Sequence, residues 1–171
     1  MDLFLNWNID DALSHLVGLV VAYLLALPIG WNREREERSA GLRTFPLVAM
    51  AACGFVMIAI EVLGAKADGQ ARILEGLMTG IGFIGGGAIL KQGDRATGTA
   101  TAASLWATGA IGAAVGYGHL DIAVIMTVVI FLTLSVISPL KTAVQENGAA
   151  DAGGGGPVSH AVNRAAGRIA T

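Results

Sequence analysis

The stretch TGIGFIGGGAIL, from Thr79 to Leu90, carries five glycines and holds no charge and no proline. Each glycine inside a helix costs about 0.5–1 kcal/mol relative to alanine in water. In a bilayer the helix persists because lipid cannot hydrogen-bond a broken backbone, and the missing side chains let a second helix approach closely. We therefore expect this stretch to be a packing surface inside a membrane.

The composition of the whole chain indicates the same class. Hydrophobic residues make up 54% of the chain and charged residues only 14%, whereas an ordinary soluble domain has roughly 25% charged residues. So few charges cannot cover the surface of a folded protein in water. The composition therefore predicts an integral membrane protein.

Five apolar segments lie along the chain, each close to the ~20 residues that cross a ~30 Å hydrocarbon core. We expect Pro28 to loosen the end of the first segment, Thr44 to cap the second and Pro139 to end the fifth. The predicted fold is an all-α bundle of five transmembrane helices within residues 1–140. The segments are Leu13–Gly30, Phe45–Leu63, Ile73–Leu90, Ala100–Gly118 and Ile122–Ser138.

The basic residues are distributed unevenly between the two sides of such a bundle. Of the eleven lysines and arginines, only Lys66 and Arg72 fall on the side of the N-terminus. The positive-inside rule therefore predicts the N-terminus outside and the C-terminus in the cytoplasm. Residues 141–171 contain four consecutive glycines and few large apolar side chains, so we expect them to form a disordered cytoplasmic tail.

Glycines recur at four-residue spacing in the third and fourth segments, which is typical of closely packed membrane helices. The run from Gly80 to Gly85 also matches the G-x-G-x-x-G pattern of dinucleotide-binding turns, but it lies within an apolar span, and no acidic residue follows about 20 positions on to bind a ribose. We interpret the glycines as helix-packing residues. The candidates are Gly76, Gly80, Gly82, Gly85, Gly86, Gly87, Gly112 and Gly116.

The densest charge cluster is the predicted loop from Asn32 to Thr44, with four arginines and three glutamates. One interpretation is a solvated loop that only sets the topology. The other is a docking surface, because guanidinium groups and carboxylates at a membrane face can pair with a partner protein or with lipid phosphates.

Four charged residues gather around the predicted connection between the second and third helices: Glu61, Asp68, Arg72 and Glu75. Glu75 lies inside the apolar span, and an ionisable residue at that depth is a candidate functional group. The set is interpreted either as ion pairs around Arg72 that hold the helical hairpin or as a site for Mg²⁺ or protons. The three histidines show no metal-ligand spacing, so no metal site is established.

Three stretches resemble the MgtC/SapB family of bacterial inner-membrane proteins: PIGWNREREERSAGLRT at 28–44, DGQARILEGLMTGIGFIGGGAIL at 68–90 and TATAASLWATGAIGAAVGYG at 99–118. The resemblance implies a multi-pass membrane domain. In its best-known branch, the family is tied to growth at low Mg²⁺, to acid tolerance and to restraint of the F-type ATP synthase. The resemblance further implies that the residues of this chain that match the family's motifs are important. These are Arg33, Glu34, Arg35, Glu36, Ala40, Gly41, Leu42, Arg43, Thr44, Asp68, Arg72 and the glycines of 80–87.

The leading functional hypothesis is a non-enzymatic protein of the bacterial inner membrane that acts through contacts with other membrane proteins or with itself, in magnesium, ion or acid-stress homeostasis. The alternative is a small oligomeric channel or transporter for Mg²⁺ or protons. We expect no cofactor and no nucleic-acid partner, and we expect membrane lipids around the bundle. No motif of a metalloprotease or of an intramembrane protease is present.

Overall fold

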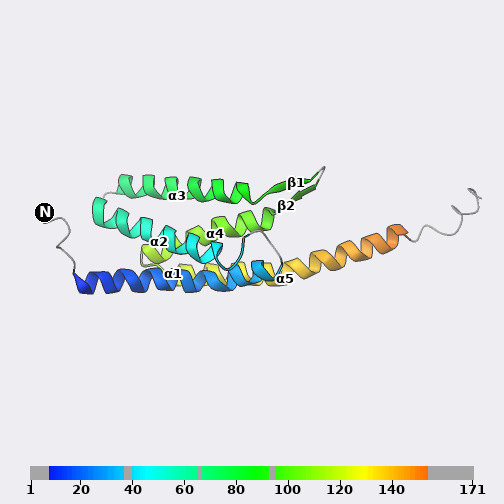
Figure 1. Ribbon diagram of the computed structural model, residues 1–171, viewed down its shortest axis with the longest axis horizontal. Coiled ribbons are helices and arrows are strands. Elements are labelled where there is room, and N and C mark those ends of the chain that lie inside the picture. The colour runs from blue at the N-terminus through cyan, green and yellow to red at the C-terminus, as the bar shows by residue number, and fades with distance from the viewer. Residues whose placement is uncertain (1–7, 37–39, 65–66, 93–94, 154–171) are drawn as a thin grey trace, which may run out of the picture. The chain divides into compact units, whose positions relative to one another are not determined.

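Five helices form most of the protein in the computed structural model, which describes residues 8–36, 40–64, 67–92 and 95–153. A short antiparallel hairpin, made of β1 (Leu90–Gln92) and β2 (Arg95–Thr97), joins the third helix to the fourth (Figure 1). The predicted helical class is confirmed, with this hairpin in addition. The helices are α1 (Ile9–Arg35), α2 (Thr44–Leu63), α3 (Ala67–Gly87), α4 (Thr99–Gly116) and α5 (Leu120–Gly153).

The first helix begins at a polar cap and ends in basic residues. The side chain of Asn8 accepts a hydrogen bond from the backbone N–H of Asp10 at 3.1 Å, and Arg33 and Arg35 lie in the last turn, where cations offset the helix dipole. The 27 residues of α1 reach about 40 Å at ~1.5 Å per residue. The helix continues past Pro28 and past the predicted end at Gly30, because a proline removes only one backbone hydrogen bond.

The second helix does not begin as expected, because Arg43 precedes its first residue and makes no side-chain cap. Thr44 is already helical, so the prediction that it caps α2 is wrong. The backbone N–H groups of Thr44 and Phe45 instead donate to the carbonyl oxygen of Gly41 at 3.0 and 3.2 Å, and Pro46 has no N–H to satisfy. The Gly41 carbonyl oxygen therefore accepts the hydrogen bonds that a capping side chain would otherwise accept.

The ends of the third and fifth helices also differ from the predicted segments. Helix α3 ends at Gly87, and Leu90 begins β1. Gly98, which precedes α4, has a left-handed φ of 86°, and a side chain there would meet the carbonyl of Ala88. Helix α5 passes through Pro139, so the prediction that this proline ends it is wrong. A proline inside a helix can kink it at the cost of one hydrogen bond without ending it.

The chain divides into two compact units, Met1–Ser135 and Val136–Thr171. The first unit holds α1 to α4, the hairpin and the part of α5 that ends at Ser135. The described part of the second unit is the rest of α5, to Gly153. Residues 141–153 of the expected disordered tail therefore have helical backbone, and residues 154–171 of that tail lie outside the described residues.

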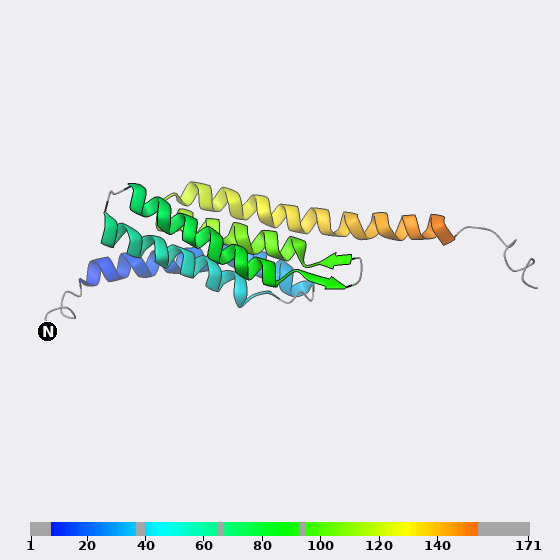
Figure 2. The same cartoon turned by 90° about the horizontal axis from the view of Figure 1, so that it is seen from above.

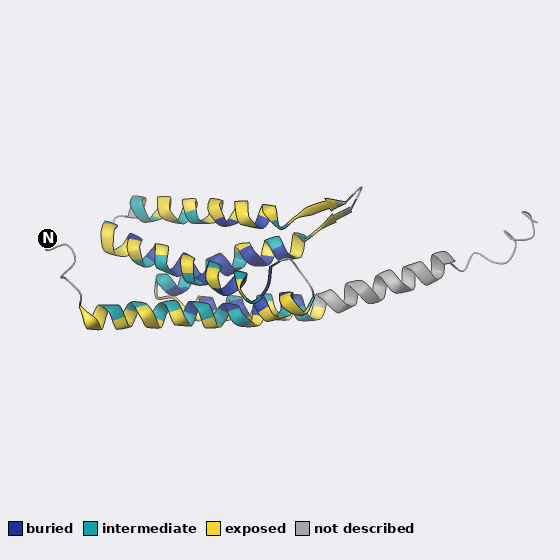
Figure 3. Cartoon of the chain, in the orientation of Figure 1, coloured by how far each residue is buried: buried dark blue, intermediate teal, exposed yellow. Residues whose placement is uncertain are grey.

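The core of the first unit lies between α2 and α4, which make the most extensive helix contact. Figure 2 shows the helices of this unit from above. Burial concentrates on α2 and α4, whereas α3 is mostly exposed (Figure 3). A Cβ on Gly112 would collide with the carbonyl of Ala49, and one on Gly116 would lie 2.9 Å from the carbonyl oxygen of Cys53. The two backbones therefore touch directly, as small residues allow.

Three hydroxyl residues are buried in α4, namely Thr101, Ser104 and Thr108, and two of them donate hydrogen bonds within the helix. Ser104 donates to the carbonyl of Ala100 at 2.8 Å, and Thr108 donates to the carbonyl of Ser104 at 2.8 Å. Such bonds to the carbonyl four residues earlier satisfy a hydroxyl inside its own helix. They let small polar residues occupy a closely packed surface.

Two of the described helices, α1 and α2, are long and apolar enough to cross a membrane, as judged by length and composition. A shorter apolar stretch covers Leu120–Val136 in α5. Exposed large apolar side chains are numerous on α1, α2 and α5. Extensive exposed apolar surface of this kind is typical of contacts with a membrane or with other proteins.

Gly112→Ala should destabilise the bundle, because the added methyl group meets the backbone of α2. Overpacking of this kind costs about 1–3 kcal/mol. Gly82→Ala is the matched control, because the space around Gly82 is open within the chain, and alanine is favoured over glycine in a helix. Thermal unfolding in detergent measures both. A midpoint for Gly112→Ala that equals or exceeds that of Gly82→Ala would contradict the packing described here.

Candidate functional site

The charged motif at the end of α1 is centred on a buried arginine, because Arg33 has only 1% of its surface exposed. Its Nε and Nη2 atoms donate to Asn32 Oδ1 at 3.2 and 2.6 Å, and Nη2 lies 3.1 Å from Glu36 Oε1. A buried charge needs such partners, since burial of an unpaired ion costs several kcal/mol. Asn32 in turn donates to the hydroxyl of Ser135 on α5 at 3.3 Å.

The neighbouring Glu34 holds the connection between α1 and α2. Its Oε2 accepts a hydrogen bond from the backbone N–H of Leu42 at 3.1 Å. A side chain on Gly41 would collide with this carboxylate, and a Cβ on Gly30 would lie 3.3 Å from the carbonyl oxygen of Gly41. The two glycines therefore let the connection fold back against the end of α1.

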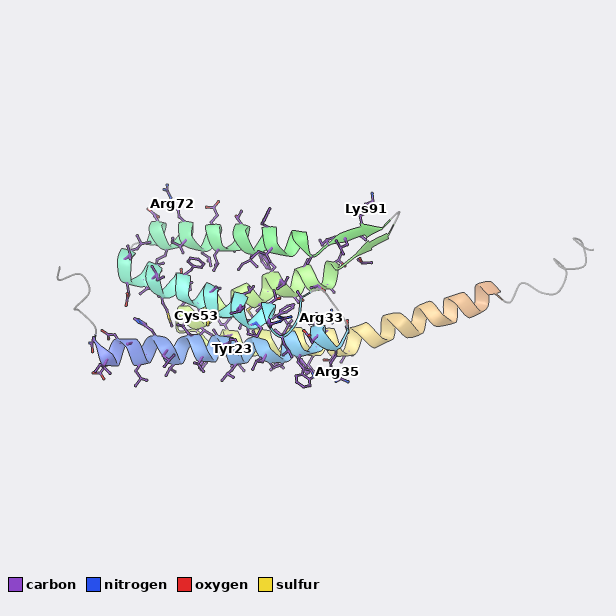
Figure 4. All side chains as sticks on the ribbon, in the orientation of Figure 1. Tyr23, Arg33, Arg35, Cys53, Arg72 and Lys91 are labelled. Carbon is purple, nitrogen blue, oxygen red and sulfur yellow. The ribbon has the colours of Figure 1, made fainter. Side chains whose placement is uncertain are left out.

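Only part of the predicted docking surface is accessible. Arg33 is buried and Glu36 is half-buried, and Glu34 is exposed but bonded to the backbone of Leu42. Arg35 and Arg43 are exposed as well. Figure 4 shows the side chain of Arg35 on the opposite side of α1 from that of Arg33. Residues 37–39 of the motif lie outside the described residues.

A groove runs between α2 and α3, which we call the α2–α3 groove. It has a volume of about 730 Å³. Arg43 and Thr44 line one end, and Arg72 lines the part nearer the other end. The remaining lining is apolar or glycine: Leu47, Val48, Ala51, Ala52, Phe55, Ile73, Gly76, Leu77, Gly80, Ile81 and Ile84.

The predicted cluster of Glu61, Asp68, Arg72 and Glu75 is not assembled. Glu61 pairs instead with His15 of α1 at 3.2 Å. Among the described residues no ion pair joins Arg72 to an acidic residue, and no group of three acidic, histidine or cysteine side chains could hold a metal ion. Exposed ion pairs are worth only about 0–1 kcal/mol, so sequence neighbours such as Arg72 and Glu75 need not pair.

The His15–Glu61 pair was missed by the sequence reasoning, although both residues lie at the same end of adjacent antiparallel helices. The pair joins α1 to α2 at the end opposite the Arg33 junction. Ser135 was missed as well, because nothing in the sequence around a serine in an apolar segment indicates that it accepts a hydrogen bond from α1.

The glycines predicted to pack helices fall into two groups. Gly112 and Gly116 lie against α2, and a Cβ on Gly85 would lie 3.2 Å from the carbonyl oxygen of Ala102 on α4. The others have open space around them within this chain, so for these residues close packing stays a prediction about contacts with another molecule. They are Gly76, Gly80, Gly82, Gly86 and Gly87.

The family model described as the MgtC family matches residues 19–143, which include the Arg33 junction and the α2–α3 groove. This chain belongs to the MgtC family. The match begins after His15, so the His15–Glu61 pair lies partly outside it. Membership of the MgtC family and the apolar helices α1 and α2 make the chain a membrane protein.

Several curated MgtC relatives are similar over the same region. Protein SrpB of Synechococcus elongatus is 40% identical over 72% of this chain and 74% of its own length. Protein MgtC of Brucella abortus is 38% identical over 71% of this chain and 50% of its own length, and protein MgtC of Salmonella typhimurium is 36% identical over 68% and 49%. The chain thus spans about half the length of these two MgtC proteins. No solved structure matches it.

Arg33→Met should lower stability strongly, because it leaves Asn32 and Glu36 without the guanidinium that they hold. Because the Glu36 side chain is 25% exposed, the loss should be that of a charge-assisted hydrogen-bond network, about 1.5–3 kcal/mol. Arg35→Met is the control, because Arg35 is exposed and a change there should lie within about 0.5 kcal/mol. Unfolding titrations of both variants in mixed micelles measure the difference, and equal losses would show that Arg33 is not a structural residue.

Proposed function

We propose that this MgtC-family protein is a non-enzymatic, five-span protein of the bacterial inner membrane that acts through contacts with other membrane proteins or with itself, in magnesium, ion or acid-stress homeostasis. Family membership supports the setting. The exposed face of α3 is the observation that supports action through protein contacts.

This face of α3 is poorly suited to lipid. Arg72, Glu75, Thr79, Gly82 and Gly86 are all exposed and follow one another at steps of three or four residues, so they lie on one side of the helix. A carboxylate against hydrocarbon is costly, and bare glycines favour close approach of another helix. A protein partner that covers this face satisfies both requirements.

The proposed orientation, with the N-terminus outside, agrees with the charges at the two ends of the bundle. Arg35, Arg43 and Lys91 lie at the end where α1 and α3 finish and α2 begins. This end would face the cytoplasm under the positive-inside rule. Asp68 and Asp121 lie at the start of α3 and α5, at the opposite end.

Single cysteines should test the orientation against a low background, because the native Cys53 is buried. Lys91→Cys should react only with a reagent supplied from the cytoplasm, and Asp68→Cys only with one supplied from outside. Each position is exposed, so failure to react reports sidedness. Labelling of both from the same side of intact cells would contradict the five-span topology.

Gly86→Leu should abolish function in cells without loss of folding, because Gly86 has open space around it within the chain and lies on the proposed contact face. The measurement is growth of a deletion strain, complemented by each variant, at low Mg²⁺ or at acid pH. Val20→Phe is the control, because it adds similar bulk to an exposed apolar position on α1. Full complementation by Gly86→Leu would rule out the α3 face as the contact surface.

An ion-flux assay separates this proposal from the channel or transporter alternative. Purified protein in liposomes should carry neither Mg²⁺ nor protons, and Glu75→Gln should leave folding unchanged. A flux that disappears in Glu75→Gln while the protein still folds would make Glu75 part of an ion pathway, since the amide removes the charge that a cation needs.

A further inference from the structure

The α2–α3 groove is an apolar trough with Arg43 at one end and Arg72 nearer the other, and the further basic residues Arg35 and Lys91 lie at the Arg43 end. Its walls carry large apolar side chains such as Leu47, Phe55 and Ile73, and Gly76 and Gly80 are two positions on its α3 side that have no side chain. A trough of this kind fits an extended hydrocarbon chain, because it offers apolar contact along its length and few polar groups.

The polar groups at the Arg43 end are available for a ligand. Arg43 is exposed, Thr44 is half-buried, and neither side chain has a hydrogen bond or ion pair in the described part of the chain. The described carboxylates of this motif are already engaged, since Glu34 accepts from the backbone of Leu42 and Glu36 pairs with Arg33. The first backbone N–H groups of α2 are bonded to Gly41, so the two side chains supply the donors.

Basic residues outnumber acidic ones at this end among the residues that the structure describes, since Arg33, Arg35, Arg43, Lys91 and Arg95 lie there with Glu34 and Glu36. Arg35 and Lys91 are the other exposed basic side chains there, whereas most described acidic residues lie towards the opposite end of the helices. A basic pocket between membrane helices on the cytoplasmic side is a recurring site for anionic lipid head groups. These distant acidic residues are Asp10, Asp11, Glu61, Asp68, Glu75 and Asp121.

We propose that the α2–α3 groove binds one anionic phospholipid of the surrounding bilayer. The Arg43 guanidinium pairs with the phosphate, the Thr44 hydroxyl donates to it, and an acyl chain lies along the groove against Gly76 and Gly80. A helix from a second copy fits less well, because all copies insert in one orientation and would bring another basic end to Arg43. A lipid phosphate supplies the opposite charge.

The test uses the full-length protein in detergent, stripped of lipid, with phosphatidylglycerol as the anionic probe and phosphatidylcholine as the zwitterionic control. Phosphatidylglycerol should raise the thermal unfolding midpoint of the wild type more than phosphatidylcholine does, and native mass spectrometry should show one retained lipid. Arg43→Gln should weaken phosphatidylglycerol binding on the order of tenfold, as expected for loss of a charge-assisted hydrogen bond.

A second pair of variants tests the groove without touching the charge. Gly80→Leu fills the groove, whereas Gly82→Leu adds the same bulk to α3 at a residue that does not line it. Both positions have open space, so both variants should fold, and only Gly80→Leu should lose the retained lipid. Glycerol 3-phosphate should not raise the midpoint, because it lacks an acyl chain.

Three results would overturn the proposal. The first is equal stabilisation of the wild type by the two lipids, and the second is unchanged binding by Arg43→Gln. The third is a Gly80→Leu variant that keeps its lipid but changes its oligomeric mass, which would assign the groove to a helix of a second copy.

Discussion

The burial of the Arg33 guanidinium is the constraint on which one end of this bundle depends, the end where α1 finishes and α2 begins. A cation with 1% exposure is tolerated only where partners surround it, and here they include Asn32 of its own helix and Glu36, the C-cap residue of that helix. Asn32 extends the contact to Ser135 on α5. The end of α1 and the first unit's part of α5 are therefore joined through one polar chain.

The same junction positions the start of α2. Once α1 ends at Arg35, Glu34 binds the backbone of Leu42, and the carbonyl of Gly41 reaches the first N–H groups of α2. Arg43 is thereby left exposed at the mouth of the α2–α3 groove. The charged motif, which the sequence presents as one surface, therefore contains two kinds of residue. Glu34 stabilises the fold, and Arg43 remains available for a ligand.

Composition and segment length predicted the helices because both follow directly from the cost of exposing apolar residues and of breaking backbone hydrogen bonds in lipid. The ends were predicted less well. Helix α1 continues past the predicted end at Gly30, Pro139 lies inside α5, and Thr44 is replaced as a cap by the Gly41 carbonyl. Helix propensities describe the preference of each residue within its own stretch of sequence. Contacts in the folded protein can override them.

Side-chain partners across helices could not be predicted, because they depend on how each helix is rotated. Glu61 has Asp68 and Arg72 nearby in sequence but pairs with His15. The glycine spacing shows the same limit, since Gly112 meets α2 while Gly82, at the same four-residue periodicity, meets nothing in this chain. Spacing indicates that a surface is flat, and only the fold decides which neighbour covers it.

A double-mutant cycle between Arg33 and Glu36 tests most directly whether the charged motif is a structural junction. The single variants Arg33→Met and Glu36→Gln and the double variant are unfolded by titration in mixed micelles, and the coupling energy is taken from the three losses. The account predicts a coupling of about 1–3 kcal/mol, typical of residues in one buried network. Additive losses, within about 0.5 kcal/mol, would mean that the motif does not hold the bundle together and is a solvated surface.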